Sequence, residues 1–140
     1  MKSEVILSAR APEALGAYPH ARRVGNLLLI SGMGPRRRGE ANVPGVELDA
    51  AGRVVRYDIE AQCRAVFENV RVVLEDAGSS WERLVDVTVF LTDLERDFAT
   101  YNRIYAEYFG SVHACRTTIG VARLPGPIAI ELKCIATLPE

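Results

Sequence analysis

The chain has 140 residues, of which 49% are hydrophobic and 25% are charged. This length supports one domain with its own core, so we expect a single domain over residues 1–140, and the composition excludes a disordered or fibrous protein. The formal net charge of −1 argues against nucleic acid as the main partner.

No apolar stretch approaches the roughly 18 residues that a membrane span requires, so we expect no membrane partner. The first residues, MKSEVILSARAPE, include acidic residues and a proline, which is unlike a secretory signal. Three cysteines lack the spacing of a disulfide framework and favour reduced thiols: Cys63, Cys115 and Cys134. These features predict a cytoplasmic protein.

Apolar runs rich in β-branched residues predict strands, the first two of which precede any helix. In chain order the predicted strands cover Glu4–Ala9, Asn26–Ser31, Leu84–Leu91, Thr117–Val121 and Ile128–Leu138. The least regular stretch lies between Gly32 and Tyr57 and predicts a long loop or an irregular hairpin. Its arginine run, Arg36–Arg38, either gathers anions or stays solvated, and solvated surface is the commoner outcome for a charge run.

Helical periodicity predicts a first helix from the N-cap Asp58 to Gly78 and a second one, with an aromatic face, from after Asp97 to Gly110. This order of elements predicts an α+β sheet with both helices on one face. In the strand that begins at Leu84, one alternating set is expected to face the helices: Val85, Val87, Val89 and Leu91. The other face is too apolar for solvent, so we expect an oligomer that covers it.

Two charged residues stand in the apolar runs near the end of the chain. Arg116 begins the run RTTIGVA, and Glu131 interrupts IAIEL. A guanidinium fits a carboxylate in two places, and a poorly solvated carboxylate can accept a proton, so the pair suggests a site for a small carboxylic acid. The alternative is a structural cross-strand ion pair between the two side chains.

Other chemistries lack their motifs. Neither the H-x-E and P-C-x-x-C segments of zinc deaminases nor the G-x-S-x-G and P-loop patterns occur. His113, Cys115 and Cys134 offer scattered ligands without a fourth, so we expect no metal. Cys115 could be an activated thiolate beside Arg116, but strand alternation points it away, which favours a buried structural cysteine.

Several segments of the chain resemble the Rid family, the reactive intermediate deaminases also called YjgF. They are ISGMGP (30–35), AQCRAVFENVRVVLEDAGSSWERLVDVTVFLTDL (61–94), DFATYNRIYAEYF (97–109) and CRTTIGVARLPGPIAIELKCIA (115–136). The resemblance runs from about Ala11 to the end of the chain, and its most specific parts are the Arg116 strand, the turn at Leu124 and Pro125, and the Glu131 strand.

The resemblance implies a chorismate-mutase-like α+β fold with a sheet of about six strands, associated as a homotrimer with clefts between subunits. It further implies hydrolysis of imines and enamines of 2-amino acids to 2-oxo acids and ammonia, without metal or organic cofactor. Arg116 matches the carboxylate-binding arginine, and Glu131 matches the water-positioning glutamate. Further cleft positions are matched by Tyr18, Ser31, Gly32 and Asn102, some of them from an adjacent subunit.

The chain departs from many deaminating members at Thr118, where they have cysteine, so thiol-dependent behaviour is not expected. The arginine-bearing insert followed by GVELDAAGRVVRYDIEAQ resembles the 2-aminomuconate deaminase branch, which makes 2-aminomuconate the leading substrate. The alternative is a broad-specificity deaminase of 2-iminobutanoate and 2-iminopropanoate. A noncatalytic ligand-binding or RNA-acting member is a third possibility. A dicarboxylate substrate needs a second cation, and the candidates are Arg22, Arg23 and Arg36–Arg38, with Arg23 and Arg37 foremost.

Overall fold

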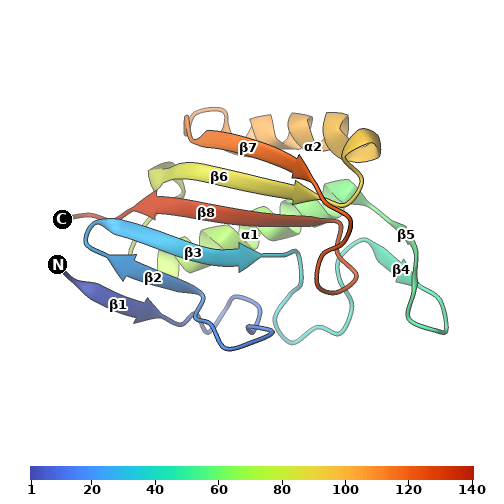
Figure 1. Ribbon diagram of the computed structural model, residues 1–140, viewed down its shortest axis with the longest axis horizontal. Coiled ribbons are helices and arrows are strands. Elements are labelled where there is room, and N and C mark those ends of the chain that lie inside the picture. The colour runs from blue at the N-terminus through green and yellow to red at the C-terminus, as the bar shows by residue number, and fades with distance from the viewer.

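Alternating apolar residues build a six-stranded sheet in the computed structural model, which describes residues 1–140 (Figure 1). The strand order across the sheet is β1-β2-β3-β8-β6-β7. The bounds are β1 Ser3–Ile6, β2 Ala21–Val24, β3 Leu27–Met33, β6 Leu84–Leu91, β7 Cys115–Gly120 and β8 Ile130–Thr137. Strands β6 and β7 are parallel, whereas all other neighbours are antiparallel.

Both helices pack on one face of this sheet, so the predicted α+β class is confirmed (Figure 1). Helix α1 covers Ile59–Asp76, and the Asp58 side chain caps it by accepting from two backbone N–H groups. Helix α2 covers Leu94–Phe109 and begins earlier than predicted, because Asp93 provides the cap. Neither helix is long and apolar enough to cross a membrane.

The structure adds three short strands to the prediction. Strand β2 was not predicted, because its four residues include two arginines, Arg22 and Arg23. The irregular region forms a separate hairpin of β4 (Val46–Leu48) and β5 (Val54–Tyr57) whose register shifts after Glu47. This outcome agrees with the irregular-hairpin interpretation.

The prediction for Val85 is wrong. Its side chain is 41% exposed, while Leu84, Val87, Val89 and Leu91 are buried. The pairing of β6 with β8 shifts between Leu84 and Asp86, and such a β-bulge moves one residue out of the alternation.

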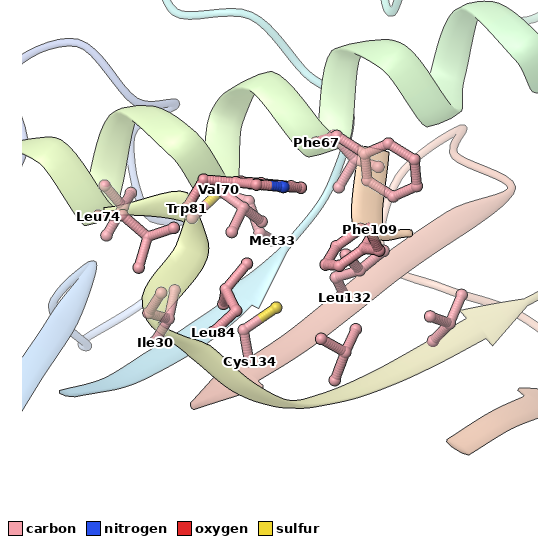
Figure 2. Packing of buried hydrophobic residues seen from close by; sticks show 14 of the residues in the cluster. Ile30, Met33, Phe67, Val70, Leu74, Trp81, Leu84, Phe109, Leu132 and Cys134 are labelled. Carbon is pink, nitrogen blue, oxygen red and sulfur yellow. The ribbon is translucent and has the colours of Figure 1, made fainter. Parts of the chain in front are cut away.

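The core lies between α1 and the helix-covered face of the sheet (Figure 2). Phe67 is fully buried, and its ring packs against Trp81 and Phe109 with centroid distances of 6.4 and 5.3 Å. Edge-to-face aromatic contacts of this kind add to the burial of apolar area. The cluster holds helices α1 and α2 on the sheet whose strands β7 and β8 carry Arg116 and Glu131.

Candidate active site

Arg116 and Glu131 lie on opposite faces of the sheet. Val87 of β6 is buried under the helices and is the register partner of Arg116 on β7. Phe90 of β6 is the register partner of Glu131 on β8 and points to the face without helices. Because paired residues project to the same side of a sheet, the two charged side chains cannot form an ion pair within one chain. The cross-strand ion pair is therefore wrong for the single chain.

Arg116 is held against the aromatic face of α2. Its guanidinium carbon lies 4.7 Å from the ring centre of Tyr105 and 5.4 Å from that of Tyr101, which are favourable cation–π distances. One guanidinium nitrogen, Nη1, donates to Oδ1 of Asn102 at 2.8 Å. None of the ion pairs in the structure involves Arg116. Its charge is therefore available to an anion.

Thr118 lies on the same side of β7 as Arg116. Its hydroxyl is 2.8 Å from the hydroxyl of Tyr101. Burial raises the pKa of Tyr101, so this phenol stays neutral and can exchange a hydrogen bond with Thr118. The predicted substrate contact at Thr118 would thus come from a hydroxyl that Tyr101 already orients.

Glu131 is half-buried on the other face, and no hydrogen bond or ion pair in the structure engages its carboxylate. Burial raises the pKa of this carboxyl above its ordinary value, because the charged form is poorly solvated there. Gly32 approaches so closely that a Cβ on it would lie 2.8 Å from Oε2 of Glu131. A larger residue at this point on β3 would displace the carboxylate, which is the flexible end of the Glu131 side chain.

A hollow of about 300 Å³ opens beside the Glu131 carboxylate. Tyr18, Gly32 and Pro125 line it, together with Arg36. An adjoining hollow shares Tyr18, Gly32, Pro125 and Glu131, and adds Ser31 and Lys133. Tyr18, Ser31, Gly32 and Glu131 are thus gathered on one face, as the resemblance implies.

Arg23 and Arg37, the two foremost candidates for a second cation, lie away from both Arg116 and Glu131. Arg23 pairs in register with the buried Leu28, so it projects to the helix side of β2, where it donates to the backbone oxygen of Gly25 at 2.9 Å. Arg37 lines a different hollow over α1, beside Arg64 and Glu68. Arg36 is the arginine of the loop that lines the hollow beside Glu131.

The three scattered candidate metal ligands are not gathered. Cys134 is buried on the helix side, while Cys115 pairs in register with Asp86 and points to the open face. The expectation of a buried Cys115 is wrong for the single chain, because its side chain is exposed. No group of three His, Cys, Asp or Glu side chains is arranged to hold a metal ion.

Sequence reasoning missed the aromatic contacts of Arg116. Phe98, Tyr101 and Tyr105 recur at helical spacing in DFATYNRIY, which signals one shared face of α2. That periodicity alone does not show which strand residue the face contacts, because the partner comes from β7, separated from α2 by the turn after Gly110.

Residues 8–138 match the family model described as Endoribonuclease L-PSP. A RutC family protein of Pyrococcus abyssi is 39% identical over 137 residues, which cover 97% of this chain and 98% of that protein. The chloroplastic Reactive Intermediate Deaminase A of Arabidopsis thaliana is 37% identical over 138 residues, covering 99% of this chain and 67% of that protein. The crystal structure of E. coli TdcF with bound serine superposes with a TM-score of 0.81 at 32% identity, covering 97% and 99% of the two chains.

Proposed function

The chain belongs to the endoribonuclease L-PSP family, which includes reactive intermediate deaminases, and we propose that it hydrolyses an imine or enamine of a 2-amino acid. The products are a 2-oxo acid and ammonia. The observation that carries this proposal is a pair of charges without ion-pair partners. One is the Arg116 guanidinium, which packs against aromatic rings, and the other is the half-buried Glu131 carboxylate beside a hollow. They match the two chemical requirements of such a reaction, a carboxylate anchor and a proton acceptor.

In the proposed mechanism, Arg116 binds the C1 carboxylate of the substrate through two parallel hydrogen bonds. Water then adds to C2 of the protonated imine while Glu131 accepts one of the water protons. Glu131 returns this proton to the amine nitrogen of the resulting carbinolamine, the C2–N bond breaks to release ammonia, and the carboxylate takes the proton of the C2 hydroxyl, so that the 2-oxo acid forms. That proton then passes to the ammonia, which leaves as ammonium, and Glu131 is again ionised. An enamine substrate first takes a proton on carbon to become the imine, after which the same steps follow.

We further propose that two copies of the chain form each site, because one chain places its two charged groups on opposite faces. The open face supports this assembly. Leu27, Val85 and Ile119 are each at least 40% exposed there, and a neighbouring copy would cover them. A homotrimer with sites between subunits would cover the open face and would also join the two charged groups, with Arg116 from one copy and Glu131 from the next.

The substrate tail separates two candidates within this reaction class. One is 2-aminomuconate, which would give 2-oxo-hexenedioate (4-oxalocrotonate), and the other is 2-iminobutanoate, a monocarboxylate. The cation-bearing loop beside Glu131 favours the dicarboxylate. Ammonia release measured with each substrate in turn tests the choice, and the absence of release from both would contradict the deaminase proposal.

An RNA-acting role finds less support, although the family model carries the word endoribonuclease. The formal net charge is −1, and ion pairs engage most of the arginines over α1, including Arg10, Arg38 and Arg64. A nucleic-acid site needs unpaired basic surface. We therefore keep the prediction that a small molecule, and not RNA, is the partner.

The raised pKa of Glu131 gives the proposal a pH dependence. Only the ionised carboxylate can accept a proton from water, so activity is lost as the pH falls through this raised pKa. We expect the acid limb of kcat to lie above 4.5, the ordinary value for glutamate. A limb at or below that value in a pH profile of kcat would contradict this role.

A further inference from the structure

Arg36 is the arginine that reaches the hollow beside Glu131. It lines this hollow together with Tyr18 and Gly34. The structure contains no ion pair to Arg36, whose only hydrogen bond as a donor runs from Nη2 to the backbone oxygen of Glu13 at 2.9 Å. The Glu13 carboxylate instead pairs with Arg38 at 3.3 Å. Arg36 thus brings an uncompensated positive charge to the site.

The backbone that carries Arg36 is fixed before any ligand binds. Asn69 of α1 is buried, and its amide nitrogen donates to the backbone oxygens of Gly34 at 2.9 Å and of Arg36 at 2.6 Å. A Cβ on Gly34 would lie 3.0 Å from Ile128, so the loop also packs closely on the segment before β8. A cation on a loop held in this way loses little freedom when it binds an anion.

The other candidate cations are directed elsewhere. Arg22 donates to the Ser3 hydroxyl, and Arg38 donates to the backbone oxygens of Ser8 and Ala11. Lys133 lines the adjoining hollow, but its amine donates to the backbone oxygen of Ile30 at 2.5 Å. Lys133 also lacks an ion pair, so Arg36 and Lys133 are the two unpaired cations near Glu131. Of the two, Arg36 is the one that lines the hollow of about 300 Å³, and Lys133 serves as the comparison.

We propose that Arg36 binds a second anionic group of the substrate, so that the preferred substrates are imino or enamino acids with an acidic tail. This inference rests on the proposed deaminase function. The substrate would then lie between two guanidiniums, with its C1 carboxylate on Arg116 of one copy and its tail on Arg36 of the next. The carbon that water attacks lies between them, beside Glu131.

The test compares two imines of equal chain length, made in place by an amino-acid oxidase from glutamate and from norvaline. Semicarbazide traps the surviving imine, so its product reports how fast the protein removes each one. The unaltered protein is expected to prefer the glutamate-derived imine. In Arg36→Gln the ratio of kcat/KM for the acidic over the neutral imine is expected to fall about tenfold or more, as expected for a lost charge-assisted contact.

Matched variants separate binding of the tail from support of the loop. Arg37→Gln removes the neighbouring charge, which faces another hollow, and is expected to keep the ratio. Arg36→Lys keeps a cation and is expected to keep most of the preference. Any of three results would overturn the proposal. The ratio stays unchanged in Arg36→Gln, it falls equally in Arg36→Lys, or it falls in Lys133→Gln and not in Arg36→Gln. If the unaltered protein removes neither imine and does not act on 2-aminomuconate, the deaminase function itself is wrong.

Discussion

Replacing Arg116 with lysine is expected to lower kcat/KM by roughly two orders of magnitude or more, because an ammonium cannot form the two parallel hydrogen bonds of a guanidinium. Lysine is also shorter, so its charge would lose the cation–π contacts with the rings of Tyr101 and Tyr105. The contact with Asn102 would be lost as well. Steady-state removal of the free imine, reported by the decrease in its semicarbazide product as the substrate concentration is varied, measures this loss.

The folded state is expected to tolerate the change at Arg116. No ion pair depends on this side chain, and its neighbours are aromatic rings that remain packed against one another. The melting temperature of Arg116→Lys should therefore stay close to that of the unaltered protein. Arg103→Lys on the exposed surface of α2 is the matched control and should retain activity. A loss of activity that follows a loss of folding would show that Arg116 is structural.

Replacing Glu131 with glutamine is expected to lower kcat about 10²- to 10⁴-fold, the usual contribution of a positioned proton acceptor. Glutamine keeps the size and the hydrogen-bonding oxygen of the side chain but cannot take the water proton. Substrate binding should change less than kcat, because Arg116 still holds the carboxylate. Single-turnover measurement of ammonia release separates the two effects.

The stability of Glu131→Gln should match or exceed that of the unaltered protein at neutral pH. Burial disfavours the ionised carboxylate, whose raised pKa reflects this cost, and the neutral amide avoids it. Glu82→Gln on the exposed surface after α1 serves as the control and should leave both activity and stability unchanged. Full activity in Glu131→Gln would remove this residue from the mechanism.

The sequence predicts most elements of this fold because their signals are local. Asp58 and Gly78 mark the ends of α1, and Gly78 follows the helix with a positive φ of 82° that favours glycine. Val85 shows where the prediction failed. A β-bulge depends on pairing with β8, more than 40 residues later in the chain, so strict alternation within β6 gave the wrong face.

The candidate site was only partly predictable. Arg116 and Glu131 stand out because charge is rare in apolar strands, but the face that each one occupies follows from the register of three strands. The sequence pattern does not show that Arg36, and not Arg37 or Arg38, lines the hollow beside Glu131. The position of Arg36 depends on Asn69 of α1, which is 33 residues away in the sequence and donates hydrogen bonds to the backbone of the loop.

In the proposed site, Arg116 and Glu131 act together across two copies of the chain. The most direct test mixes two inactive variants, Arg116→Lys and Glu131→Gln, under conditions that allow the subunits to exchange. In a random trimer about one site in four would then join an intact Arg116 from one copy to an intact Glu131 from its neighbour. The proposal predicts recovery of about a quarter of the unaltered activity, whereas no recovery after verified exchange would contradict it.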